Sequence, residues 1–215
     1  MILPSILSTS HLHLMERLEP LRGIATTIHV DIEDGIFVPN LSFGPMLIKE
    51  IHEEFGFELD IHYMVREPQR YIDIFKDVPH SWVSYHFETG FRPDDLSFPK
   101  GAKIGVAINP DTWDVPHEVL SRIDFLVIMG VYPGFGGAKF EESTFDLVKR
   151  FRSVRDESDY DYDIMVDGGV NKGNIRKLKL SGADHFVAGS GVFSNDPLLS
   201  FMELNRICDS DDRDQ

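Results

Sequence analysis

The segment Thr27-Ile28-His29-Val30-Asp31-Ile32-Glu33-Asp34-Gly35 decides which fold the sequence favours. Its β-branched residues followed by Asp-Gly are typical of a strand that ends in a turn. Side chains alternate along a strand, so His29, Asp31 and Glu33 share one face while Val30 and Ile32 share the other. In a barrel the aliphatic pair would pack against the outer helices. The three polar groups would then point inward, toward the end where barrels bind ligands.

Similar strand-type runs recur along the whole chain and alternate with segments of helical periodicity. The predicted strands are Ile2–Leu7, Thr27–Ile32, Leu59–Val65, Trp82–Phe87, Lys103–Ile108, Phe125–Val131, Asp163–Val166 and His185–Ala188. The predicted helices are His13–Leu21, Met46–Phe55, Gln69–Asp77, Thr144–Asp156, Asn174–Leu180 and Leu198–Ile207. Asp196 and Pro197 before the last helix are a capping residue and a favoured first helical residue.

Eight strand–helix units of roughly 27 residues each predict an α/β protein, a single-domain (β/α)8 TIM barrel. We place the barrel at residues 1–208 and an acidic C-terminal tail at residues 209–215. The fourth unit, Thr89–Gly101, leaves room for one turn of helix at most. A doubly wound open sheet shows the same alternation, but its usual dinucleotide glycine pattern after the first strand is absent. The glycine-rich turns come late, after the last three strands, which favours the barrel.

Composition excludes several functional classes. Apolar residues make up 42% and charged residues 27% of the chain, as in a globular protein with a substantial core. A net charge of −15 argues against binding to nucleic acid or to an anionic membrane. The lone cysteine, Cys208, cannot form an internal disulfide, and no secretory signal is visible. We therefore expect a cytoplasmic protein.

Four metal-ligand side chains fall at the ends of different predicted strands: His29, Asp31, His62 and Asp167. Two imidazoles and two carboxylates suit zinc, and also manganese, iron or cobalt. The alternative is that each is a strand-end polar group satisfied by ordinary hydrogen bonds. A lone inward histidine would favour that alternative. Two histidines and two aspartates near corresponding strand ends instead favour a divalent metal site. His86 and Glu88 add a further polar pair on one side of the fourth strand, whereas the remaining histidines are assigned to surface or packing roles.

Glycine-rich turns follow strands six, seven and eight. The first is Gly134-Phe135-Gly136-Gly137, the second Gly168-Gly169 and the third Gly189-Ser190. Backbone N–H groups of such turns, together with helix N-termini, bind anions without needing lysine or arginine. Three such loops in succession predict a phosphate site, which reconciles a phosphorylated ligand with the acidic composition.

At this point the sequence resembles the ribulose-phosphate 3-epimerase family along nearly its whole length. The matching motifs are Pro4–Leu7, His29–Asp31 with Asp34-Gly35, Phe37–Asn40, Phe43–Pro45, His62–Val65, Asn109-Pro110, Met129, Pro133–Gly137, Val166–Gly169 and Ala188–Ser190. The resemblance implies a metal-dependent epimerase that inverts carbon 3 of a ketose phosphate, interconverting D-ribulose 5-phosphate and D-xylulose 5-phosphate. It implies acid–base catalysis by Asp31 and Asp167 through a metal-stabilised enediolate, with Ser5 and His62 contacting the substrate. The expected partner is a phosphorylated ketose, and we expect a homo-oligomer.

Three departures from the family pattern bear on the substrate. Glu33 replaces a methionine that usually joins Met64 and Met129 in a cap over the reacting carbon, Gly130 replaces a common threonine, and the fourth unit is short. The added carboxylate can reach a substrate hydroxyl or alter the metal site. A hexulose-phosphate epimerase, such as one acting on D-allulose 6-phosphate, is therefore an alternative. So is a non-catalytic sugar-phosphate-binding protein. Aldol-type or decarboxylating chemistry is less favoured, because the strand ends carry no lysine.

Overall fold

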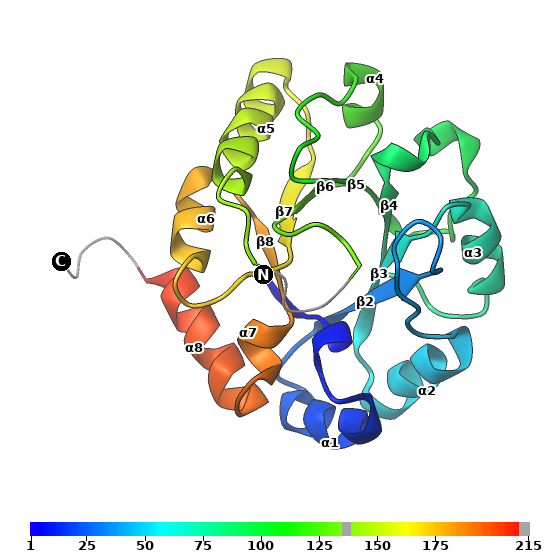
Figure 1. Cartoon of the computed structure of the whole chain (residues 1–215), viewed down its shortest axis with the longest axis vertical. Coiled ribbons are helices and arrows are strands. Elements are labelled where there is room, and N and C mark those ends of the chain that lie inside the picture. Colours follow the sequence, from blue (N-terminus) through cyan, green and yellow to red (C-terminus); the bar gives the residue numbers. More distant parts are fainter. Residues whose placement is uncertain (135–138, 211–215) are drawn as a thin grey trace.

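The computed structural model describes residues 1–134 and 139–210. It confirms the predicted (β/α)8 barrel, with one eight-stranded sheet, and Figure 1 shows the strands in a central ring with the helices outside it. The strands are β1 (Ile2–Pro4), β2 (Thr27–Glu33), β3 (Glu58–Met64), β4 (Trp82–His86), β5 (Lys103–Ile108), β6 (Phe125–Met129), β7 (Asp163–Asp167) and β8 (His185–Ala188). All seven strand pairings are parallel, in the order β1-β8-β7-β6-β5-β4-β3-β2. A single parallel bridge between Ser5 and His29 links β1 to β2 and nearly closes the ring.

The helices follow the predicted order. They are α1 (Leu14–Leu18), α2 (Pro45–Phe55), α3 (Pro68–Ile74), α4 (His117–Leu120), α5 (Thr144–Ser158), α6 (Ile175–Ser181), α7 (Ser190–Phe193) and α8 (Pro197–Asp209). The cap expected at α8 is present, because the Asp196 side chain accepts a hydrogen bond from Leu199 N. The same helix continues to Asp209, one residue into the segment that we assigned to the tail, and residues 211–215 lie outside the described residues.

The outer layer is thin on one side of the barrel. Between β4 and β5 the chain forms only two 3-10 turns, η4 (Phe87–Thr89) and η5 (Pro93–Asp95), as expected for the short fourth unit. Between β5 and β6 the only helix is the four-residue α4, a second shortening that the sequence had not indicated. None of the helices within the described residues combines the length and apolar composition needed to cross a lipid bilayer.

Side chains that alternate along each strand pack into two different hydrophobic layers, one outside the sheet and one inside the barrel. Outward side chains such as Val30, Ile32 and Ile61 join the large core between sheet and helices. A smaller cluster fills the barrel interior: Leu3, Trp82, Ala107, Phe125, Val127, Met129, Met165 and Val187. This interior packing closes the barrel below the polar residues of β2 and β3, so the ligand site is confined to the carboxyl ends of the strands.

Two predicted strands, β1 and β6, end more than one residue earlier than expected, and β3 and β4 end one residue earlier. β1 stops at Pro4 because Ser5 bridges to His29 and Ile6–Ser8 form a 3-10 turn (η1). β6 stops at Met129, and the Gly130 N–H makes the last ladder bond, to the carbonyl of Asp167, where β7 also ends. His185, assigned above to a surface or packing role, is the first residue of β8, where the strand was predicted to begin, and its Nε2 lies 3.0 Å from Asp163 Oδ2.

Candidate active site

The polar residues of β2 and β3 form three inward layers. Because the two strands pair in parallel register, residues opposite each other share a face. The register partners are His29 with Asp60, Asp31 with His62, and Glu33 with Met64. All six side chains are buried, each with 4% or less of its surface exposed. The middle layer lies toward Asp167 at the end of β7, and the third layer lies above it, at the barrel mouth.

His29, Asp31, His62 and Asp167 converge on one point. His29 Nε2 lies 3.2 Å from Asp31 Oδ1 and 3.4 Å from Asp167 Oδ2. His62 Nδ1 lies 3.1 Å from Asp167 Oδ2 and 3.7 Å from Asp31 Oδ1. The ligand atoms that the four residues offer are all within 4.8 Å of one another. Strand ends from β2, β3 and β7 thus bring together two imidazole nitrogens and two carboxylate oxygens, as the sequence predicted.

This geometry fits a divalent cation. A tetrahedral zinc with ligands at about 2.0–2.1 Å has ligand–ligand edges of about 3.3 Å. The four nitrogen–oxygen separations, between 3.1 and 3.7 Å, are close to that value. The opposite nitrogen of His29, Nδ1, lies 2.7 Å from Oδ2 of the fully buried Asp60. Metal-binding histidines usually donate their second N–H to such a carboxylate, which fixes the tautomer and orients the ring.

The electrostatics of the cluster also favour a cation. Burial disfavours a charged His29, but the carboxylates of Asp31, Asp167 and Asp60 outweigh it and raise the pKa of His29 well above its usual value. Burial would likewise raise the pKa of Asp167, yet the charges and hydrogen bonds of His29 and His62 hold it well below its usual range. The negative charge that favours a protonated His29 also favours a metal ion, which would bind in exchange for that proton.

Glu33 occupies the layer above the metal cluster. Asn40 Nδ2 donates to Glu33 Oε2 at 2.7 Å, and Ser42 Oγ accepts from the Glu33 N–H while donating to the Asp31 carbonyl. Burial, and then the charge of Asp31, raise the pKa of Glu33 to about 7, with a further contribution from Asp167. The register of β2 with β3 places Glu33 on the same inward face as His29 and Asp31.

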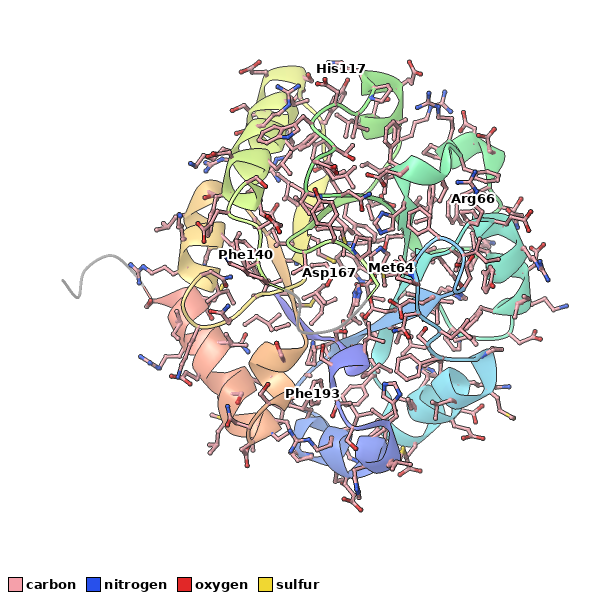
Figure 2. The ribbon with its side chains drawn as sticks, in the orientation of Figure 1. Met64, Arg66, His117, Phe140, Asp167 and Phe193 are labelled. Carbon is pink, nitrogen blue, oxygen red and sulfur yellow. The ribbon has the colours of Figure 1, made fainter. Side chains whose placement is uncertain are left out.

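A cavity at the barrel mouth holds most of the predicted substrate residues. Its empty space, open mouth included, is about 490 Å³. Predicted residues on its wall are Ser5, Asp31, Met64, Met129, Gly134, Asp167, Gly168, Gly169, Gly189 and Ser190, and Leu7, Ser8, Val131 and Pro133 complete it. Figure 2 shows Met64 and Asp167 near the middle of the ring. His62 and Glu33 are not among the lining residues, but they are the register partners of Asp31 and Met64, which are. Phe135, Gly136 and Gly137 lie outside the described residues.

The glycine-rich loop after β7 depends on one close backbone approach. A Cβ at Gly130 would lie 2.2 Å from the Gly168 carbonyl oxygen and 2.9 Å from Phe140 Cε2. Gly168 and Gly169 both adopt positive φ, at 97° and 69°, a conformation that other residues rarely adopt. Gly130 therefore allows the β7 loop to fold against the end of β6 with its backbone at the cavity.

Replacing Gly130 by alanine should displace this loop. We expect Gly130→Ala to lower the free energy of unfolding by about 1–3 kcal/mol, as overpacking does, and to raise KM for a phosphorylated substrate more than it lowers kcat. Thermal unfolding and steady-state kinetics measure both effects. Gly44→Ala is the matched control, since a Cβ there meets nothing within 4 Å. An unchanged KM in Gly130→Ala would show that the loop position is not needed for binding.

Sequence reasoning missed two buried residues of the site. Asp60 has the inward phase of His62 on the same strand, which was the signal that could have identified it. His86 was noted only as part of a polar pair with Glu88. In the structure its ring stacks on His62, with centroids 5.0 Å apart, and contacts Phe37 at 4.9 Å. Glu88 Oε2 lies 3.1 Å from His86 Nδ1 and orients that ring.

Comparisons with known sequences all match the same protein family along most of the chain. The profile of the ribulose-phosphate 3 epimerase family matches residues 1–193. A ribulose-phosphate 3-epimerase of Aquifex aeolicus is 34% identical over 198 residues, covering 90% of this chain and 89% of the relative. Its counterpart in Bacillus subtilis is 37% identical over 198 residues, covering 89% and 91%. The Escherichia coli K12 protein is 36% identical over 200 residues, covering 90% and 88%.

Solved structures with low sequence identity share the fold. Orotidine 5'-phosphate decarboxylase from Pyrococcus horikoshii aligns with a TM-score of 0.70 at 13% identity, covering 98% of this chain and 100% of that one. Phosphoribosyl anthranilate isomerase from Thermococcus kodakaraensis aligns with a TM-score of 0.60 at 12% identity, covering 98% and 99%. At such identities the likeness establishes the barrel and nothing about the reaction.

Proposed function

The chain belongs to the ribulose-phosphate 3-epimerase family and is a carbohydrate epimerase, and we propose from this that it interconverts D-ribulose 5-phosphate and D-xylulose 5-phosphate. The proposed reaction inverts carbon 3 by removing its proton on one face and returning a proton on the other. It takes place in the mouth cavity, with Asp31 and Asp167 as the acid–base pair.

The placement of these two aspartates is the observation that most supports the proposal. Asp31 is an inward residue near the end of β2, and Asp167 is the last residue of β7. Both side chains line the same cavity. In the strand order β2 and β7 are separated by β1 and β8, so their carboxylates approach a bound sugar from different sides. Proton removal on one face and delivery on the other requires such a pair.

Neighbouring side chains hold the two carboxylates in place. Ser5 Oγ donates to Asp31 Oδ2 at 2.8 Å, which leaves Oδ1 directed toward His29 and His62. His62 Nδ1 lies 3.1 Å from Asp167 Oδ2 and fixes the second carboxylate in the same way. His29, Asp31, His62 and Asp167 would hold a divalent ion, most consistent with zinc and also with manganese, iron or cobalt. When bound, it would act as a Lewis acid that offsets negative charge developing on the sugar oxygens.

The phosphate of the substrate would bind on the other side of the cavity. Gly168, Gly169, Gly189 and Ser190 line it there, and Ser190 is the first residue of α7. No lysine or arginine is on the described cavity wall, so backbone N–H groups and the serine hydroxyls of Ser8 and Ser190 are the donors available there. An anionic group held on these loops would place the carbon chain over the aspartates.

The test is a substrate panel in deuterium oxide with defined metals. We expect turnover of D-ribulose 5-phosphate and D-xylulose 5-phosphate, and one solvent deuterium atom at carbon 3 of the product. Epimerisation without deuterium incorporation would overturn the two-carboxylate mechanism. The same panel includes D-allulose 6-phosphate, because a higher kcat/KM on that sugar would make the protein a hexulose-phosphate epimerase. Binding of the sugar phosphate without any turnover would instead identify a non-catalytic binding protein.

Two further parts of the proposal concern the setting of the protein. We place it in the cytoplasm, a reducing compartment that suits the buried free thiol of Cys208, and we expect it to assemble as a homo-oligomer. We propose that its binding partner is the phosphorylated ketose. We expect it to bind neither nucleic acid nor membrane, in keeping with its net charge of −15.

A further inference from the structure

The carboxylate of Glu33 is buried with one oxygen unused. Asn40 donates to Oε2, whereas Oε1 is buried and has no hydrogen-bond partner among the described residues. The residue is 4% exposed, so bulk water does not satisfy that oxygen. An unpaired buried acceptor is costly. Such an arrangement lowers stability and indicates an acceptor reserved for a ligand.

The surroundings hold this acceptor in one orientation. Asn40 fixes one carboxylate oxygen, and Ser42 ties the backbone of Glu33 to that of Asp31. Both partners belong to the loop after β2, which also bridges back to the strand through Asp34 and Leu41. A carboxylate fixed in this way loses little freedom when it accepts one more hydrogen bond.

The strand register determines where a ligand would meet Glu33. The layer of Asp31 and His62 belongs to the metal cluster, and the next inward layer toward the mouth is Glu33 with Met64. Met64 lines the cavity, and Glu33 is its register partner. A sugar resting on the lower layer therefore contacts Met64, an unbranched and adaptable side chain. The part of the sugar that moves this thioether aside reaches Glu33.

The chemistry of a ketose phosphate identifies that part. Its phosphate lies at one end of the carbon chain, carbon 3 near the middle, and the carbon 1 hydroxymethyl group beyond the carbonyl. With the phosphate on the loops after β7 and β8 and carbon 3 between Asp31 and Asp167, the carbon 1 end extends away from the phosphate. The strands on that side include β2 and β3.

Resting on the proposed function, we propose that Glu33 is a specificity-determining residue whose Oε1 accepts a hydrogen bond from the carbon 1 hydroxyl of the sugar. A site built to bind a hydroxyl discriminates strongly against an analogue that lacks it, because the buried acceptor is then left unpaired. The protein should accordingly require a 1-hydroxymethyl ketose and reject 1-deoxy ketose phosphates.

The experiment compares D-xylulose 5-phosphate with 1-deoxy-D-xylulose 5-phosphate. Solvent deuterium exchange at carbon 3, followed by NMR, gives kcat/KM for both at equal bound metal. We expect the wild type to prefer the hydroxylated sugar by about 100-fold or more. Glu33→Met, which keeps the length of the side chain and removes the acceptor, should lower that ratio at least about tenfold. The nearly isosteric Glu33→Gln should give an intermediate ratio.

Controls separate this role from a structural one. Glu53→Gln makes the same chemical change on the exposed face of α2 and should leave the ratio unchanged. If Glu33→Met does not fold, Asn40→Ala and Glu33→Gln provide the test, because each disturbs the acceptor and should lower the ratio. An equal loss on both sugars in the folded variants overturns the Glu33 proposal and leaves the epimerase assignment standing. No exchange on either sugar by the wild type refutes the proposed function itself.

Discussion

Asp31→Asn and Asp167→Asn should each slow epimerisation by about 10³-fold or more, while each variant continues to exchange the carbon 3 proton of one epimer. A positioned acid or base contributes about 10²–10⁴-fold to a rate, and inversion needs both groups in every turnover. Exchange needs only the base that faces the proton. The two variants should therefore act on opposite epimers, with Asp31→Asn exchanging one sugar and Asp167→Asn the other.

Deuterium uptake by each pure epimer, read by NMR, measures this difference. Metal content must accompany the kinetics, because both aspartates are also candidate ligands. Asparagine keeps an oxygen in place, so Ser5 can still donate to residue 31. Asp163→Asn is the matched control: Asp163 lies at the opposite end of β7 and pairs with His185, and its variant should keep full activity. If both site variants exchange the same epimer, the assignment of one base to each face is wrong.

The convergence of the four candidate metal ligands was predictable from the sequence because strand periodicity fixes which way a side chain points. His29 and Asp31 share a face of β2, and His62 shares the corresponding face of β3. In a barrel every inward face meets the same interior, so residues far apart in the sequence were expected to converge. The structure brings Asp167 within 3.1 Å of His62 in this way, across 105 positions of the chain.

The residues that escaped prediction are those whose role depends on contacts between loops and strands. Asp60 shares the inward phase of His62, but its role as the partner of His29 Nδ1 depends on the register between β2 and β3, which the sequence alone does not fix. Similarly, Phe37 comes to rest on His86 because the loop after β2 folds over the mouth. The early end of β6 follows from its neighbours, because the β5 pairing stops at Ile128 and β7 stops at Asp167, and local propensity does not encode where a partner strand ends.

Asp60→Asn should weaken binding of the divalent metal by about 10–100-fold, the usual effect of removing the outer partner of a metal-binding histidine. The Asp60 carboxylate lies 2.7 Å from His29 Nδ1 and is fully buried, so it both selects the tautomer and adds negative charge behind the ring. An amide in its place can turn its N–H₂ toward Nδ1. The imidazole would then carry its proton on Nε2, the nitrogen that faces Asp31 and Asp167.

A competition titration with a chromophoric chelator gives the metal affinity directly, without reference to turnover. The expected order is wild type, then Asp60→Asn, then His29→Asn, which removes the imidazole ligand itself. Activity of Asp60→Asn should recover at high metal concentration, because Asp31 and Asp167 are intact in that variant. Unchanged affinity in Asp60→Asn, with His29→Asn also binding normally, would mean that the imidazole is not a ligand. The four-residue cluster would then be a hydrogen-bonded network rather than a metal site, and proton transfer between Asp31 and Asp167 would have to proceed with no charge offset except from the two histidines.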